Sequence, residues 1–230
     1  LRWALSQSNN WISAYLIREY SPQSLVKLMH SFGIKSKLDP VISLCLGPVE
    51  VSVSEMVDAY TTFVNKGIKV DPLYVTRIED NKGNVISSFT PQYTEIISEE
   101  TSHKMLEMLK AVINEGTGVR LRYRYQFKGD IGGKTGTTQN NSDGWFIGVT
   151  PELVSGTWVG GEDRSIHFDN LREGQGASMA LPVWALYMQK VYADETLGYS
   201  DTLKFDIPEH LQKEYKECVS NDVVEDLLFN

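Results

Sequence analysis

Long apolar runs are the first thing that this 230-residue sequence lacks. Its apolar stretches, such as Val41–Leu46, are far shorter than the roughly 20 residues of a membrane-spanning helix, which excludes such a helix. Residues are 41% hydrophobic and 23% charged, as in an ordinary globular protein. This composition excludes disorder, collagen or a coiled coil as a description of the whole chain. The length allows one large domain or two small ones.

Cysteine and histidine are also scarce. Cys45 and Cys218 lie far apart, and the four histidines show no spacing typical of metal ligands. The sequence therefore predicts no metal and no cofactor, and it leaves the redox state of the cysteines open. A histidine-based catalytic triad also stays open, because the members of a triad meet in space rather than in sequence.

Basic residues are outnumbered, 22 against 30 acidic ones, which gives a net charge of −8. A nucleic-acid partner is therefore not expected, since such a partner needs a concentrated basic face. The one candidate is Arg120–Tyr125, where arginine and tyrosine alternate, and this alternation predicts a strand with a solvated face. Residues 199–230 hold eight acids and three lysines. We predict a body over residues 1–198 and an acidic C-terminal extension over 199–230.

Hydrophobic periodicity predicts a mixture of helices and strands. A proline after a cap residue, a capping box at Ser52–Glu55 and terminal glycines mark helix ends. The helices are expected at 11–20, 22–32, 53–66, 98–115 and 178–192, and the strands at 73–79, 84–89, 130–138, 145–150 and 153–159. Short polar connections favour antiparallel pairing of the last three strands. The predicted fold class is α+β, an antiparallel sheet packed with helices.

The stretch Gly132–Thr138, which reads GGKTGTT, is the most informative motif. It matches the end of a phosphate-binding loop, G-x-x-x-x-G-K-[ST], but the position of the first glycine holds Lys128. The stretch also leads through a polar turn into a strand, whereas a phosphate-binding loop leads into a helix. Nucleotide binding is therefore the weaker of two interpretations.

The stronger interpretation is the K-T-G motif of serine acyltransferases that react with penicillin, whose set is S-x-x-K, S-x-N and K-T-G. By composition, S-x-N should occur about once by chance and K-T-G about 0.07 times, so K-T-G is the informative match. Ser8-Asn9-Asn10 supplies an S-x-N upstream of it. Three further stretches match as well, namely Gly116–Gly118, Asp143–Thr150 and Thr157–Gly160. With these motifs, the chain closely resembles class A penicillin-binding proteins over residues 1–192.

The resemblance implies a catalytic role for three residues. Ser8 would relay a proton to the leaving amine, and the amide of Asn10 would hold a backbone carbonyl of the substrate. Lys134 would provide a positive field that keeps Ser8 competent and attracts the carboxylate of the substrate.

Three further residues would bind the substrate. The hydroxyl of Thr135, or that of Thr137, would hold the terminal carboxylate, and Gly136 would leave room for a peptide to lie along the strand. The backbone N–H of Thr137 would be one oxyanion donor, a contribution of about 3 kcal/mol. Trp145, Trp158 and Trp184 are expected in the core and not as a sugar platform.

The nucleophile motif departs from the family pattern. Ser24-Leu-Val-Lys27 matches S-x-x-K, but it follows S-x-N in the chain. The apolar stripe and the N-terminal cap of the helix expected at 22–32 account for these residues without a catalytic role. The sequence also begins with Leu1 at helical spacing. We therefore expect the chain to be the C-terminal part of a transpeptidase domain, with the nucleophilic serine and its lysine upstream of Leu1.

The function that the resemblance implies is a penicillin-sensitive D,D-transpeptidase that cross-links peptidoglycan stem peptides ending in D-Ala-D-Ala. β-Lactam antibiotics would be ligands, and the full-length protein would also be a peptidoglycan glycosyltransferase, while this fragment alone would be inactive. An anchor in the missing N-terminal segment would hold the protein at the outer, periplasmic face of the cell membrane. Two alternatives stay open: a D,D-carboxypeptidase or β-lactamase-like hydrolase, and a non-catalytic binding module of the same fold.

Overall fold

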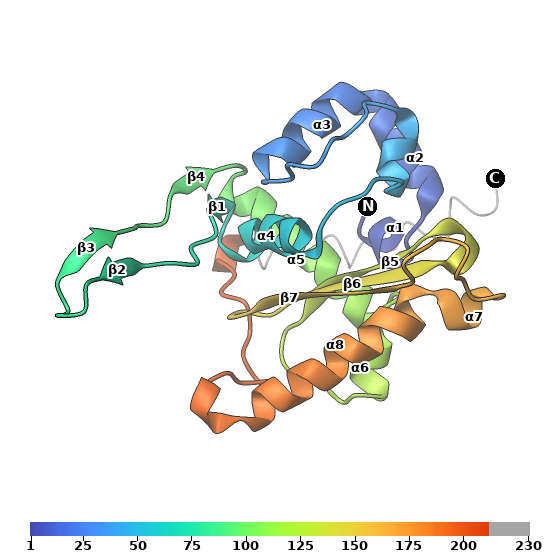
Figure 1. Cartoon of the computed structure of the whole chain (residues 1–230). Coiled ribbons are helices and arrows are strands. Elements are labelled where there is room, and N and C mark those ends of the chain that lie inside the picture. The colour runs from blue at the N-terminus through green and yellow to red at the C-terminus, as the bar shows by residue number, and fades with distance from the viewer. Residues whose placement is uncertain (212–230) are drawn as a thin grey trace.

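The computed structural model describes residues 1–211, so Cys218 and residues 212–230 of the acidic extension lie outside the described part. Its centre is an antiparallel sheet of three strands in the order β5-β6-β7, namely β5 (Gly132–Thr137), β6 (Asp143–Val149) and β7 (Val154–Gly160). Helix α8 (Gly176–Ala193) covers one face of the sheet, α4 (Val53–Val64) lies on the other, and α5 (Glu99–Asn114) packs along β5 (Figure 1). The predicted α+β class is confirmed.

The remaining elements surround this centre. They are α1 (Arg2–Ser6), α2 (Asn10–Tyr20), α3 (Pro22–Ser31), α6 (Arg120–Tyr123), α7 (Leu171–Gly174) and the short 3-10 helices η1 (Ile42–Leu46), η2 (Gln139–Asn141) and η3 (Glu195–Leu197). The predicted helix starts are confirmed where a side chain caps them. The hydroxyl of Ser52 accepts from the backbone N–H of Glu55, whose carboxylate accepts from the N–H of Ser52, which is a complete capping box.

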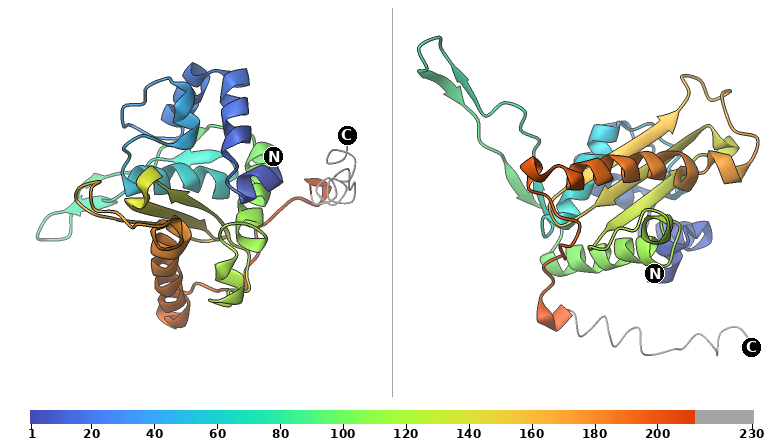
Figure 2. Two further views of the ribbon diagram at one scale, coloured as in Figure 1. Left: turned by 90° about the vertical axis from the view of Figure 1, so that its right-hand side faces the viewer. Right: turned by 90° about the horizontal axis from the view of Figure 1, so that it is seen from below.

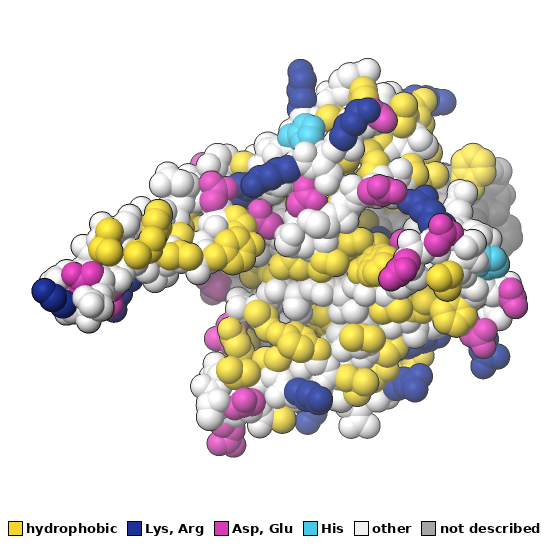
Figure 3. Space-filling model, in the orientation of Figure 1, with side chains coloured by type: hydrophobic (Ala, Val, Ile, Leu, Met, Phe, Trp, Pro, Cys, Tyr) yellow, Lys and Arg dark blue, Asp and Glu magenta, His cyan; other side chains and the backbone are white. Residues whose placement is uncertain are grey.

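A thin arm projects from the body between α4 and α5 (Figures 1 and 2). Strand β2 (Arg77–Glu79) pairs with β3 (Val85–Ser88) around the predicted turn, while β1 (Ile68–Val70) pairs with β4 (Tyr93–Glu95) at its base. The pairing at the base was not predicted, because strands of three residues are too short for a clear alternation. Apolar side chains follow the arm on the face shown in Figure 3.

The main core lies between the sheet and α8. Trp184 of α8 is 1% exposed and meets Phe146 of β6 at 5.2 Å between ring centroids. Gly148 makes this possible, because a Cβ there would lie 2.3 Å from the Trp184 ring. The core position predicted for Trp184 is confirmed, but the one predicted for Trp158 is wrong, since its side chain is 41% exposed on β7.

One local prediction is also wrong. Arg120–Tyr125 was expected to be a strand, but α6 occupies its first part, because Leu121 is buried in the core and the chain turns back immediately afterwards. The guanidinium group of Arg122 supports that turn by donating to the carbonyls of Phe127 and Gly129.

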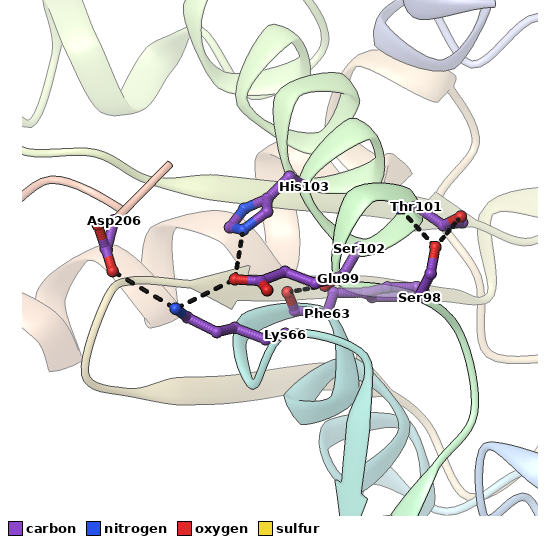
Figure 4. Close-up of polar contacts among 8 residues, drawn as sticks. All are labelled: Phe63, Lys66, Ser98, Glu99, Thr101, Ser102, His103 and Asp206. Atoms are coloured by element: carbon purple, nitrogen blue, oxygen red, sulfur yellow. Dashed lines mark hydrogen bonds and ion pairs between the residues drawn. The ribbon is translucent and has the colours of Figure 1, made fainter. Parts of the chain in front are cut away.

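The described part of the C-terminal stretch is docked on the body. Phe205 is buried beside α5, and its N–H donates to the carboxylate of Asp130 at 3.2 Å. Lys66 lies between Glu99 at 3.1 Å and Asp206 at 3.5 Å, and His103 contacts the same Glu99 oxygen at 3.4 Å (Figure 4). This cluster ties the end of α4, the start of α5 and the C-terminal stretch together.

Residues 1–211 offer neither a membrane span nor a metal site. None of the helices there has the length and apolar character that crossing a bilayer requires. No set of histidine, cysteine, aspartate and glutamate side chains in the same range is arranged to hold a metal ion.

Candidate active site

The K-T-G motif lies on β5, which is one of the two edge strands of the central sheet. Lys134 is paired with Ile147, and Gly136 with Trp145, so the motif is held in register by β6. The strand continues into η2 and then β6, not into a long helix. A phosphate-binding loop needs a helix directly after its lysine, so the structure disagrees with the nucleotide-binding interpretation.

The structure brings Ser8 and Lys134 together. The ammonium group of Lys134 donates one hydrogen bond to the hydroxyl of Ser8 and another to the carbonyl of Thr135, the latter at 2.8 Å. Ser8 stands in the turn between α1 and α2 with a φ of +55°, a left-handed conformation that is uncommon outside glycine.

Burial lowers the pKa of Lys134 to about 8, from an ordinary value of 10.5. Its side chain is taken out of water without a carboxylate beside it among the described residues, which disfavours the charged form. At neutral pH the group is still largely protonated. A half-buried cation without an anionic partner among the described residues is suited to attract the carboxylate of a ligand.

Asn10 does not join this contact. It is the first residue of α2 and is exposed, and within residues 1–211 its amide makes no hydrogen bond. The helix cap is the neighbouring Asn9, whose side chain accepts from the N–H of Ile12 at 3.1 Å. Capping therefore accounts for Asn9 and leaves the amide of Asn10 available to a ligand.

The two threonines of the motif contact different elements. The hydroxyl of Thr135, a residue only 9% exposed, is 2.7 Å from the hydroxyl of Thr117. The hydroxyl of Thr137 accepts from the backbone N–H of Gly176 at 3.0 Å, and Thr137 itself is exposed. Gly136 lies between them, where a Cβ would be 3.0 Å from that of Trp145.

Thr117 and Gly176 contribute to the site although the sequence assigned them no role. The N–H of Thr117 donates to the carbonyl of Ser6 at 3.1 Å, which ties the end of α5 to α1. Gly176 begins α8 so close to β5 that a Cβ would lie 2.1 Å from the carbonyl oxygen of Gly136. The available signal for Thr117 was the Gly116–Gly118 block, which was used only for its resemblance; for Gly176, the predicted helix began two residues later, at 178.

The structure places Ser24 and Lys27 on α3, where both are exposed. The hydroxyl of Ser21 donates to that of Ser24 at 3.1 Å and accepts from the Ser24 N–H at 3.3 Å. Ser21 and Ser24 therefore form the N-terminus of α3, as the sequence predicted. Among the described residues, no contact joins Ser24 or Lys27 to Lys134.

Comparison with known proteins defines the class. The chain belongs to the penicillin-binding protein transpeptidase family, because the profile of the penicillin binding protein transpeptidase domain matches residues 1–160. The resemblance to class A penicillin-binding proteins is thereby confirmed.

Two curated relatives carry the same protein name. Penicillin-binding protein 1A of Aquifex aeolicus is 32% identical over 191 residues, which is 83% of this chain and 25% of that protein. The protein of the same name from Neisseria lactamica is 30% identical over 198 residues, 82% of this chain and 24% of that protein. The chain therefore spans about a quarter of the length of the curated relatives it matches.

Solved structures agree on the fold. The crystal structure of penicillin-binding protein 1A from Haemophilus influenzae superposes with a TM-score of 0.75 at 26% identity, covering 85% of this chain and 34% of that one. PonA1 from Mycobacterium tuberculosis, solved in complex with penicillin V, gives 0.73 at 22% identity, covering 90% and 59%. At that identity the second likeness shows the fold alone.

Proposed function

We propose that this chain supplies one half of the active site of a serine-type D,D-transpeptidase that cross-links peptidoglycan stem peptides. The observation that carries the proposal is the contact between Lys134 and Ser8 beside the outer edge of β5. No other described strand pairs with that edge, so an extended peptide can add to it by main-chain hydrogen bonds.

The reaction that this geometry suits is acyl transfer in two steps. A serine hydroxyl attacks the carbonyl of the penultimate D-alanine, the C–N bond breaks, and the terminal D-alanine leaves as an amine. Ser8 relays the proton of the attacking hydroxyl: it gives its own proton to the leaving amine and takes up the one that the attacking serine releases. Lys134 stabilises this arrangement through its hydrogen bond to Ser8. An acceptor amine then attacks the ester, which restores the serine hydroxyl and forms the cross-link.

The terminal carboxylate of the donor peptide would bind at Lys134 and the hydroxyls of β5. Asn10, exposed at the start of α2, would hold a backbone carbonyl of the donor, and the N–H of Thr137 would be one donor to the oxyanion. β-Lactams carry a comparable carboxylate and would acylate the same serine. The complex of PonA1 with penicillin V is a relative in fold that supports this ligand class.

The attacking serine would come from an S-x-x-K motif elsewhere in the full-length protein. Ser24 does not qualify, because it is engaged at the N-terminus of α3 with Ser21. On this proposal the 230 residues alone form no acyl-enzyme. The full-length protein would also carry a glycosyltransferase domain and act at the periplasmic face of the membrane, and residues 199–230 would form an acidic extension of the transpeptidase domain.

Labelling of the full-length protein with a fluorescent penicillin, followed by peptide mass mapping, tests the proposal. An adduct on a serine outside the 230 residues supports it, whereas an adduct on Ser24 overturns the assignment of the nucleophile. A folded protein with no adduct would instead be a non-catalytic binding module.

Incubation with a pentapeptide that ends in D-Ala-D-Ala then separates transfer from hydrolysis. Cross-linked product in the presence of an amine acceptor supports transpeptidation. Release of D-alanine with only the shortened peptide remaining would identify a carboxypeptidase. Ser24→Ala is the matched control for both assays, since it removes a hydroxyl on α3 and should change neither.

A further inference from the structure

A hollow of about 690 Å³ lies between α6, α7 and α8, and Ser8, Asn10 and Lys134 do not line it. Its apolar lining is Val159, Met179 and Pro182. Two aromatic side chains, Tyr123 and Phe168, also line it and are 66% and 45% exposed. The hollow is thus open to solvent and partly apolar.

Arginine dominates the polar lining. Three of the chain's eight arginines, Arg120, Arg124 and Arg172, border the hollow. Among residues 1–211 none of the three forms an ion pair with a carboxylate. The lining contains one acid, Glu173, whose carboxylate accepts from the amide of Asn170 at 3.0 Å. Positive charge is therefore in excess here, on a chain whose net charge is −8.

One of the guanidinium groups is held in place before any ligand arrives. Nη1 of Arg120 donates to the carbonyl of Ala177 and to the hydroxyl of Ser178, both at 2.9 Å. Its other N–H groups have no partner in the described part of the chain. A preorganised guanidinium loses little entropy when it binds an anion, and its planar fork fits a carboxylate.

We propose that this hollow binds an acidic peptide. The guanidinium groups would take the carboxylates, while Tyr123, Phe168 and the apolar lining would contact the backbone and the methylene groups. Three guanidinium groups with two aromatic side chains beside them favour an organic ligand that carries several carboxylates over a small inorganic anion.

The hollow is a separate site from the candidate active site, although the first turn of α8 contributes residues to both. Ser178 and Met179 line the hollow from the first turn of α8, and Gly176 at the start of that turn donates to Thr137 of β5. No contact of Lys134 enters the hollow. Binding of the peptide should therefore survive Lys134→Ala.

Fluorescence anisotropy with a fluorescein-labelled hexaglutamate peptide and the full chain tests the proposal. We expect hexaglutamate to bind at least tenfold more tightly than hexaglutamine at low ionic strength. The affinity should fall as salt is added, because the contacts are exposed charges. The Arg124→Gln, Arg172→Gln double variant should lose at least tenfold in affinity, and Arg172→Glu alone should also weaken binding.

Arg18→Gln is the matched control, because Arg18 is exposed on α2 and also lacks an ion pair among the described residues. It should bind hexaglutamate like the parent. Equal affinity for the two peptides, or unchanged affinity in a folded Arg172→Glu variant, overturns the proposal. Displacement of hexaglutamate by an equal concentration of inorganic phosphate also overturns it, in favour of a simple anion site.

Discussion

The ammonium group of Lys134 donates a hydrogen bond to the hydroxyl of Ser8, a residue 126 positions away in the chain. Ser8 lies in a turn between two helices with a positive φ, and Lys134 lies in β5, an edge strand of the sheet. The pair therefore joins the helical part of the molecule to an edge strand of the sheet.

Replacement of Lys134 by alanine should slow β-lactam acylation of the full-length protein by a factor on the order of 100 to 1,000. That range corresponds to the loss of one charged group that stabilises an acyl-transfer transition state. Stopped-flow measurement of acylation, with circular dichroism to verify the fold, checks the prediction. Lys128→Ala is the control, since Lys128 is exposed just before β5. An unchanged rate for Lys134→Ala would refute the role proposed for the lysine.

The acylation rate should fall as pH rises through about 8, where Lys134 loses its charge. Above that value the decline should approach tenfold per pH unit, because only the protonated fraction attracts the carboxylate. Lys134→Arg stays charged and should show no such decline up to pH 10. A parent profile that is flat between pH 7 and 10 contradicts the prediction.

The lowered pKa of Lys134 also makes the free energy of unfolding depend on pH. Folding lowers the pKa of Lys134 from 10.5 to about 8, so the unfolded chain binds more protons between these values. This group therefore makes the free energy of unfolding rise with pH across that window. Urea denaturation at pH 8 and pH 10 measures the effect as the difference between the parent and Lys134→Met, in which the contribution is absent.

Gly176→Ala should destabilise the fold by about 1–3 kcal/mol, the usual effect of forcing an atom into a packed interior. The added Cβ would stand 2.1 Å from the carbonyl oxygen of Gly136, and backbone cannot move aside without disturbing β5. Chemical denaturation measures the loss, and slower acylation should accompany it. Gln175→Ala, one residue earlier and without a side-chain cap bond, should be close to neutral.

Glu55→Gln should lower stability at pH 7 by about 1 kcal/mol, because it weakens the capping box of α4. The backbone N–H of Ser52, with those of Lys35 and Ser36, holds the pKa of Glu55 at about 2 instead of 4.5. The contribution is therefore present above pH 4.5 and disappears as the pH falls toward 2. Denaturation midpoints of the parent and the variant should converge in acid. The control is Glu19→Gln on the exposed face of α2, and a parent–variant gap that persists at pH 2 contradicts the prediction.

The sequence by itself determined the local structure wherever a short-range signal was complete. The capping box at Ser52 fixed the start of α4, and the glycines and polar turns around β5, β6 and β7 fixed an antiparallel sheet. Such signals lie within a few residues and need no distant partner. The rarity of K-T-G likewise singles out Lys134 from the order of residues alone.

Only the tertiary structure decided which of the motif residues meet. It placed Ser8 against Lys134 and left Asn10 exposed, and it turned the hydroxyl of Thr135 toward Thr117. It also made a helix of Arg120–Tyr123, where alternation predicted a strand, because burial of Leu121 outweighed the local pattern. Contacts between residues more than a hundred positions apart depend on how helices pack on a sheet, and no local pattern of residues encodes that packing.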